Sequence, residues 1–571
     1  MENHPLPKIY LLLLVLWPLS CSVLLSTLPV RNIMEARNLK SAQEILDSQH
    51  WLLPTLNGKP RIKKPPLPTW AAAASAKISG SNHLFFLRLP NLFMGILFLA
   101  AFYLLTQNLF GKQYALLPTL MLLTSAQLLA EIPTARWDLF ATALGLAALW
   151  ATCRCLHHRR SLNPYLPLSI LLWTASYLSK GPLAFYLIAL PFFSTTLLAQ
   201  TLLKPSSPPF PALPDLSFQK IFQLLLILTI SLGFGNLWWL AIYLQQPNTW
   251  KILYADMVSL NQGHAKPVYY YVLRSLALMA PWSPLFLAAL FQLRQEIRIV
   301  RKFFGKIPTA TPSTQSLSIP HWNLLFSITW FLLAFALLSA VPAKKSRYFL
   351  SLLPPACLMA TFAWQNYRYL LSPLYHYSSS LLYFSLPPLA FYLLWKTGPH
   401  WTNLPLPLLW LTALPLFLRK ENPLEKTSIA LLLTLLLLPQ TLQLLPPYQQ
   451  NKYHQALKLR PLLQHQKIYL LGHASPQLLW ALNAYLLPLP SLQQIPTPSP
   501  ISYLLVEETN HTPLPNFPNL VKIYSFTIHK SHKKLQHWHL YRISPTTPKK
   551  KGQKHDHHRK PNQTIPKLHR P

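Results

Sequence analysis

Carboxylates are scarce in this sequence, so each one can be considered as a catalytic group. The 571 residues contain 14 Asp and Glu against 51 Lys and Arg. A carboxylate at membrane depth is costly and usually functional, and it can take the proton of an acceptor hydroxyl. Glu35 and Asp138, which have basic neighbours, are therefore the catalytic candidates. We expect Glu44, Asp47 and Glu131 to be solvated loop acids or helix N-caps.

Three cationic segments could hold a phosphate group. The first has four cations between Lys59 and Lys64, the second contains His264 and Lys266, and the third is Lys344–Tyr348. Fixed cations stabilise charge that grows on a leaving phosphate. Other interpretations stay open, because the first segment could bind lipid headgroups and His264 could be structural. For Tyr269–Tyr271 taken alone, an interfacial aromatic belt is favoured.

The elements that must position these groups are membrane helices. Hydrophobic residues make up 51% of the chain and charged residues 11%, whereas a soluble protein has about 25% charged residues. The mean hydropathy is +0.23. Runs of about twenty apolar residues span a bilayer. They occur near 9–28, 84–107, 114–131, 138–153, 163–179, 183–203, 221–245, 272–293, 322–342, 348–366, 379–396, 402–418 and 427–446.

The sequence thus predicts a mainly α polytopic membrane protein of about thirteen transmembrane helices. This excludes a soluble enzyme and a disordered chain. The formal net charge of +37 indicates contact with anionic membrane lipids rather than nucleic acid, because most basic residues lie between apolar runs or in the C-terminal tail.

Lysine and arginine favour the inner side of a membrane. With the N-terminus inside, the basic loops 154–160, 294–306 and 419–420 are inside as well. Two large loops, about 29–83 and 246–271, and everything after about residue 447 then lie outside. The Lys344–Tyr348 segment is also placed outside, against the charge rule, so a bound anion is a sensible reason for it.

Three regions are expected along the chain. Residues 1–446 form the transmembrane domain. Residues 447–545 form a small α/β domain outside the membrane, with strands at 467–471, 501–506, 521–526 and 538–543 and a helix at 476–485. Residues 546–571 are a basic tail that we expect to be disordered.

In their order along the chain, these motifs resemble the type C glycosyltransferases, which use polyprenyl-phosphate sugars. The similarity is greatest to the branch with the aminoarabinose lipid A transferase and the protein O-mannosyltransferase-like enzymes, and it covers about residues 10–360. It rests on Glu35-Ala36-Arg37, Asn57-Gly58, Lys64-Pro65-Pro66-Leu67, Arg88-Leu89-Pro90, Asp138, Lys180-Gly181-Pro182, His264, Pro267, Tyr269–Tyr271, Pro281-Trp282, Lys345 and Arg347-Tyr348.

The resemblance implies roles for single residues. Met34 stands where the family usually has an Asp base, so Glu35 or Asp138 would be the base or position the acceptor. Lys63 replaces an acid that binds a metal in some members, so no metal site is carried over. Lys64 matches the lysine that contacts the donor phosphate. The other residues expected at that phosphate are Arg37, His264, Lys266, Lys345, Arg347 and Tyr348.

The implied function is inverting transfer of a hexosyl or pentosyl group from undecaprenyl phosphate. The acceptor would be lipid A, another glycolipid or a protein, and the active site would face the periplasm at the inner membrane. One alternative is a lipid or small-molecule transporter, which usually places polar groups on broken helices at mid-membrane. A non-catalytic relative is the other, because Met34 and Lys63 depart from the family pattern.

Overall fold

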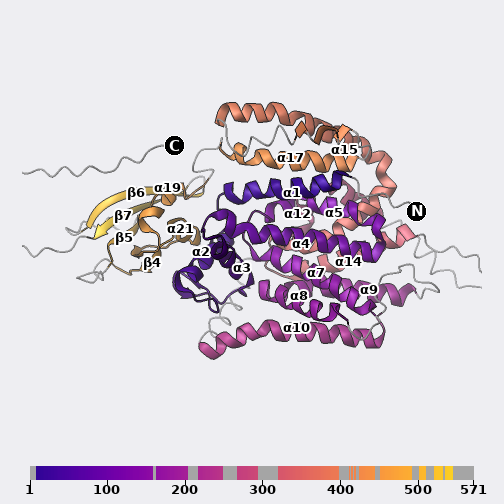
Figure 1. The fold of residues 1–571 in the computed structure, drawn as a ribbon, viewed down its shortest axis with the longest axis horizontal. Helices are drawn as coiled ribbons and strands as arrows, with labels where there is room; N and C mark the ends of the chain where they lie inside the picture. The colour runs from indigo at the N-terminus through magenta and orange to yellow at the C-terminus, as the bar shows by residue number, and fades with distance from the viewer. Residues whose placement is uncertain are drawn as a thin grey trace, which may run out of the picture.

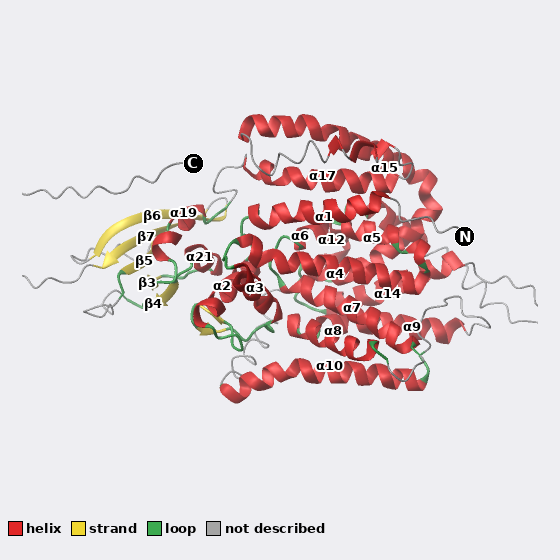
Figure 2. Ribbon diagram, viewed as in Figure 1, coloured by secondary structure: helices red, strands yellow, loops and turns green. Residues whose placement is uncertain are grey.

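A bundle of long helices carries a small sheet at one end in the computed structural model (Figure 1). Described are residues 8–158, 163–203, 216–247, 266–292, 319–397, 410–411, 413–415, 417–418, 423–443, 451–491, 501–508, 520–531 and 534–543. Two shorter helices, α2 (Ile33–Ser48) and α3 (Leu67–Ser79), lie between the bundle and the sheet (Figure 2).

The bundle elements follow the apolar runs. They are α1 (Lys8–Thr27), α4 (Leu84–Phe110), α5 (Leu116–Leu123), α6 (Ala126–Glu131), α7 (Trp137–His157), α8 (Tyr165–Lys180), the π-helical turn η2 (Phe185–Ala189), α9 (Leu190–Leu203), α10 (Phe218–Gln245), α12 (Tyr270–Met279), α14 (Ile319–Ala340), the 3-10 helix η3 (Ser346–Leu352), α15 (Leu353–Thr397) and α17 (Pro423–Gln443).

Four of the described helices are long and apolar enough to cross a membrane, namely α4, α7, α10 and the 322–340 part of α14. Tyr165–Lys180 and Phe185–Gln200 pass the same test together, although a bend of 118° separates them. The count of thirteen spans stays a prediction. Helix α10 exposes many apolar side chains, including Phe218 and Phe222, which suits contact with lipid tails.

Two of the expected spans, 348–366 and 379–396, do not form separate helices. Apart from the 3-10 turn η3, they belong to the single 45-residue helix α15, which contains Pro373, Pro387 and Pro388. Proline in a membrane helix is tolerated where local adjustments and neighbouring groups satisfy the freed backbone carbonyls. Pro373, which lies between the two expected spans, therefore does not end the helix.

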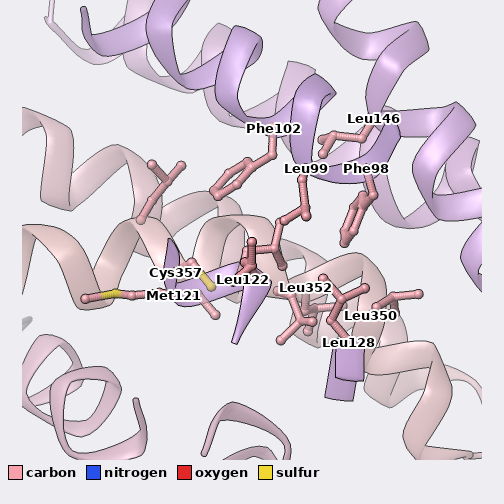
Figure 3. Close-up of a cluster of buried hydrophobic side chains, with 14 of the residues drawn as sticks. Phe98, Leu99, Phe102, Met121, Leu122, Leu128, Leu146, Leu350, Leu352 and Cys357 are labelled. Carbon is pink, nitrogen blue, oxygen red and sulfur yellow. The ribbon is translucent and has the colours of Figure 1, made fainter. Parts of the chain in front are cut away.

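Helix α7 lies at the centre of the bundle, because 89% of its most apolar 18-residue stretch is buried inside the protein. It packs against α4, α8 and η3. Gly145 permits the close approach of a neighbouring segment, because a Cβ atom there would lie 2.5 Å from the Cβ of Ala184. Figure 3 shows a cluster of apolar side chains that includes Leu146 of this helix, Leu128 of α6 and Leu350 of η3. The cluster therefore joins three of the elements that meet at the end of the bundle.

The first expected outer loop is folded. Asn32 caps α2 by accepting from the Met34 amide at 2.8 Å. Strands β1 (Thr55–Leu56) and β2 (Lys59–Pro60) form a hairpin whose turn, Asn57-Gly58, has positive φ at both residues, as a type I′ turn requires. The loop is thus a built structure rather than a floppy cationic segment.

Residues 454–543 contain the helices α19 (His454–Lys458), α20 (Arg460–Leu463) and α21 (Pro476–Leu482). The five-stranded sheet has the order β4-β3-β5-β7-β6. Its strands are β3 (Lys467–Leu471), β4 (Tyr485–Pro488), β5 (Tyr503–Glu508), β6 (Leu520–Ser531) and β7 (Lys534–Ile543). Strand β3 runs parallel to β4 and β5, whereas β7 is antiparallel to β5 and β6.

A strand lies at each of the four positions expected for one, and β4 is an addition. The expected helix 476–485 ends earlier, at Leu482, because Asn483 adopts a left-handed conformation with φ 50°. Asparagine is favoured at this position after a helix. The limits 447–545 for a separate domain stay a prediction.

The sheet region packs onto the first outer loop. Helix α21 contacts α2, and Lys40 Nζ donates to Asn483 Oδ1 at 3.1 Å. The Asn57 side chain donates to the Leu486 carbonyl at 2.6 Å and accepts from its amide at 2.7 Å. The hairpin turn is therefore attached to strand β4, although the two are separated by more than 400 residues.

Glu44 is a buried carboxylate that links helix α2 to the hairpin. It is fully buried, lies 3.7 Å from Lys40 Nζ, and accepts from the amides of Asn57 and Gly58 at 2.8 and 3.1 Å. The expectation that Glu44 is a solvated acid is wrong. The groups that donate hydrogen bonds to it lie eleven or more residues away, in the hairpin, so local sequence does not reveal its burial.

We expect Glu44→Ala to lower the free energy of unfolding by about 3–5 kcal/mol, because it leaves a buried lysine without its counter-charge. Asp47→Asn on the same helix is the matched control. Asp47 pairs with the half-exposed His465 at 3.1 Å, and such pairs contribute about 0–1 kcal/mol. Denaturant unfolding of the detergent-purified protein checks both; equal effects would contradict the role of Glu44.

Candidate functional site

Asp138 joins three elements at one end of the bundle. It lies in the first turn of α7, where the helix dipole favours a negative charge, and it is 3% exposed. Its Oδ1 atom accepts from Lys180 Nζ, at the last residue of α8. Its Oδ2 atom pairs with Arg347 Nε of η3 at 3.1 Å. Asp138 therefore fixes two cations, both of them less than about 12% exposed.

A tyrosine ring completes this group. Lys180 Nζ lies 4.1 Å from the centre of the Tyr348 ring, and the Arg347 guanidinium lies 5.6 Å from it. A cation over an aromatic face is stabilised by the ring quadrupole. Tyr348 thus helps to hold the same two cations that Asp138 pairs with.

Lys64 belongs to this cluster as well. Burial, together with the charges of Lys180 and Arg347, lowers the pKa of Lys64. The pKa of Lys345 is lowered in the same way, by burial first and then by Arg347. Four cations (Lys64, Lys180, Lys345 and Arg347) and the carboxylate of Asp138 interact here. The neighbouring Glu131 carboxylate is paired with Arg136, so among these described groups the positive charges exceed the negative ones by three. Such a cluster suits a phosphate ligand.

The first loop is held against α7 beside this cluster. The Arg61 guanidinium lies 4.7 Å from the centre of the Trp137 ring, one residue before Asp138. Arg61 also donates to the Arg37 carbonyl at 3.5 Å. Arg37 itself lies with its Nη1 atom 3.8 Å from Met34 Sδ. The structure thus places Arg37 in contact with Met34 and Arg61.

The loop before η3 is held by α12. The Tyr271 hydroxyl donates to the Lys345 carbonyl at 3.1 Å and accepts from the Lys345 amide at 3.0 Å. Tyr271 is fully buried, whereas Tyr269 is 61% exposed. An aromatic belt therefore suits Tyr269, but it is wrong for Tyr271, which fixes the backbone next to Arg347.

Lys266 is exposed and packs on the loop before η3, where its amide donates to the Pro342 carbonyl. Its Nζ atom is 4.4 Å from the centre of the Tyr270 ring, and the Tyr270 hydroxyl lies 3.2 Å from Ser346 Oγ. The structure thus brings Lys266 near the Lys345 segment without a described contact to Asp138. His264 lies outside the described residues.

Glu35 is engaged in a different pair. Its Oε1 atom accepts from Arg88 Nε at 2.8 Å and from the Ala135 amide at 3.1 Å. Arg88 also donates to the carbonyls of Leu25 and Leu28. Glu35 is 1% exposed, so it ties α4 and the end of α1 to the turn that precedes α7. Its role as the base stays a prediction.

Glu131 ends α6, four residues before that Ala135. It pairs with Arg136 at 3.0 Å and is 2% exposed, so the expectation of a solvated acid is wrong for it too. Lys180 and Arg88 were not assigned to the site from sequence, although both stand in the motifs Lys180-Gly181-Pro182 and Arg88-Leu89-Pro90. A basic residue at the end of an apolar helix usually contacts lipid headgroups. A role in a buried ion pair therefore cannot be recognised from the sequence.

Within the described residues, no group of three or more His, Cys, Asp and Glu side chains could hold a metal ion. Around Asp138 the described cations outnumber the carboxylates, and cations repel a metal. The donors present are thus suited to an anion.

The comparisons with known proteins agree with the resemblance read from the motifs. Residues 63–208 match the family described as dolichyl-phosphate-mannose-protein mannosyltransferase. The structure is similar to ArnT from Cupriavidus metallidurans in the apo state, with a TM-score of 0.62 and 14% identity over 94% of this chain and 97% of ArnT.

The same ArnT bound to undecaprenyl phosphate matches with a TM-score of 0.62, at 14% identity over 93% and 97% of the two chains. No curated protein matches this sequence. The suspected type C resemblance is confirmed, and at this identity the similarity to ArnT establishes the fold.

We expect binding of a lipid phosphate to weaken as the pH rises through the lowered pKa of Lys64, because the lysine loses its charge. Lys64→Arg should shift this loss to higher pH, since arginine stays protonated. The measurement is the Kd of undecaprenyl phosphate above about pH 8, where the phosphate is a full dianion. Lys63→Arg, the exposed neighbour, is the control. Identical profiles for both variants would contradict the role of Lys64.

Proposed function

We propose that this chain is a membrane glycosyltransferase whose donor is a sugar linked to a polyprenyl phosphate. The supporting observation is the cluster of Lys64, Lys180, Lys345 and Arg347 around the carboxylate of Asp138, at one end of a helical bundle with the ArnT fold. A phosphate ester bound there would supply the missing negative charge. The apolar helices beside the cluster would hold the lipid tail.

The reaction that suits this cluster is a single displacement. The acceptor oxygen or nitrogen forms a bond to the anomeric carbon, and the bond from that carbon to the phosphate oxygen breaks. The electron pair leaves with the polyprenyl phosphate, and the acceptor proton goes to a base. Such a displacement inverts the anomeric centre, whether the sugar is a hexose or a pentose.

The side chains of the site have different roles in this reaction. Lys64, Lys345 and Arg347 contact the donor phosphate and stabilise the charge that grows on it as the sugar departs. Asp138 keeps Lys180 and Arg347 in place, which their mutual repulsion would otherwise oppose. From this position it also orients the acceptor. Glu35, through Arg88 and the Ala135 amide, fixes the turn on which Asp138 depends.

Of the remaining expected donor contacts, Tyr348 holds the cations that pair with Asp138. Lys266 lies over Tyr270, whose hydroxyl is near Ser346, and the Arg37 carbonyl accepts from Arg61. His264 completes the set expected from sequence. We place the site at the periplasmic face of the inner membrane, with lipid A, another glycolipid or a protein as acceptor. The positive-inside pattern supports this orientation.

The test has two stages. Envelope lipids and proteins from cells with and without the gene are compared by mass spectrometry, and a mass difference of one sugar on one class identifies the acceptor. Unchanged masses in every class, together with measured substrate movement across sealed vesicles, would instead support a transporter.

Purified variants then test the site. We expect Asp138→Asn and Arg347→Ala to lower the transfer rate by at least about 100-fold, because the leaving phosphate loses its organised cations. Glu35→Gln should lower it less. Arg154→Ala, at the exposed opposite end of α7, is the control and should keep its activity. Full activity of both Asp138→Asn and Glu35→Gln would refute the mechanism.

A further inference from the structure

Three carboxylates lie near the turn between α6 and α7, and they differ in what occupies their oxygen atoms. Asp138 has a cation at each oxygen. Glu35 accepts two hydrogen bonds at Oε1, one of them from Arg88. A cation bound to an oxygen stabilises its negative charge and so weakens it as a proton acceptor. Asp138 therefore has no oxygen left to remove a proton, and the described ion pair of Glu35 leads to Arg88 of α4 rather than to the cations of the donor site.

Glu131 is arranged differently. Its Oε1 atom accepts from Gln127 Nε2 at 2.9 Å and pairs with Arg136 Nη2 at 3.0 Å. Its Oε2 atom is buried, and the structure gives it no hydrogen-bond partner among the described residues. A buried oxygen of this kind is rare and costly, and it calls for a partner that the protein itself does not supply.

This free oxygen belongs to a side chain beside the phosphate cluster. Helix α6 packs directly on η3, the element that carries Arg347. The charges of Asp138, Arg347 and Lys180 all act on the Glu131 carboxylate. Glu131 is therefore held next to the cations of the donor site, with one oxygen fixed by Gln127 and Arg136 and the other available.

We propose that Glu131 is the catalytic residue that accepts the proton of the acceptor group. In this step Oε2 forms a bond to the acceptor hydrogen, the acceptor O–H or N–H bond breaks, and the acceptor atom forms its bond to the anomeric carbon. The electron pair of the broken carbon–oxygen bond leaves with the phosphate. The inference rests on the proposed function and assigns a part of it that neither Glu35 nor Asp138 is placed to perform.

The arrangement also explains the order of groups along the turn. Glu131 and Asp138 are seven residues apart, and Arg136 between them forms its described ion pair with Glu131. The two carboxylates on either side of the turn thus have different roles. Asp138 binds the cations that receive the phosphate, and Glu131 keeps one oxygen for the acceptor.

The test is transfer by the purified full-length protein. The donor probes are undecaprenyl phosphate esters of a hexose and of a pentose. The acceptor probes are purified lipid A and a serine-containing peptide. We expect Glu131→Gln to lower kcat by about 100- to 10,000-fold, the usual contribution of a general base. Its Kd for undecaprenyl phosphate should stay within about twofold of wild type, because the cations are intact.

Two matched variants exclude a merely structural effect. Arg136→Gln breaks the same ion pair but keeps the carboxylate, so its loss of kcat should be much smaller. Glu425→Gln removes a buried carboxylate in α17 and should keep kcat. The acid limb of the wild-type pH profile of kcat should be absent from Glu131→Gln and present in both controls.

Wild-type kcat in Glu131→Gln would overturn this inference alone, as would an equal loss in Arg136→Gln. In those cases the free oxygen holds only a water molecule or supports the turn. A wild-type protein that transfers neither sugar to either acceptor would overturn the proposed function together with the inference. Donor binding, measured separately, distinguishes these results from misfolding.

Discussion

The rest of the site depends on an unbalanced electrical charge. Lys64, Lys180, Lys345 and Arg347 lie around the carboxylate of Asp138 at the end of an apolar bundle, and the neighbouring Glu131 is already paired with Arg136. Cations in a poorly solvated place repel one another strongly, so the cluster is stable only if something holds its members or neutralises them. Asp138 and the Tyr348 ring do the first. A phosphate would do the second, and its binding energy would come from the charge that the protein alone leaves uncompensated.

Such a cluster needs a rigid frame, and the frame reaches far along the chain. The apolar cluster of Figure 3 joins α6, α7 and η3, the elements that carry Glu131, Asp138 and Arg347. On the other side, Glu44 and Asn57 connect the hairpin before Lys64 to strand β4. The sheet region therefore acts on the donor site through the first loop, without contributing a described side chain to it. A shift of the hairpin would move Lys64, so the position of this cation depends on contacts made more than 400 residues later.

Much of the frame was predictable, because apolar runs and strand patterns are local. The expected runs match the described helices in outline, and the strands at 467–471, 501–506, 521–526 and 538–543 correspond to β3, β5, β6 and β7. The association of Lys64, Arg347 and Asp138 followed from the requirements of phosphate chemistry and from the family resemblance. The burial of Glu44 and Glu131 did not follow, since it depends on packing that only the folded chain creates. Lys180 was missed because a lysine that ends an apolar helix looks like one that contacts lipid headgroups.

The three buried carboxylates show why residue type alone could not assign the chemistry. Glu35, Glu131 and Asp138 are equally hidden from solvent, yet their partners give them different properties. Arg88 and a backbone amide make Glu35 a brace for the turn, and two cations make Asp138 an anchor for charge. Glu131 combines one fixed oxygen with a buried one that no described group satisfies, and it lies within reach of the charges of Arg347 and Lys180. A base must be oriented and also have a free lone pair, and Glu131 meets both conditions beside the donor cations, whereas Asp138 has a cation at each oxygen.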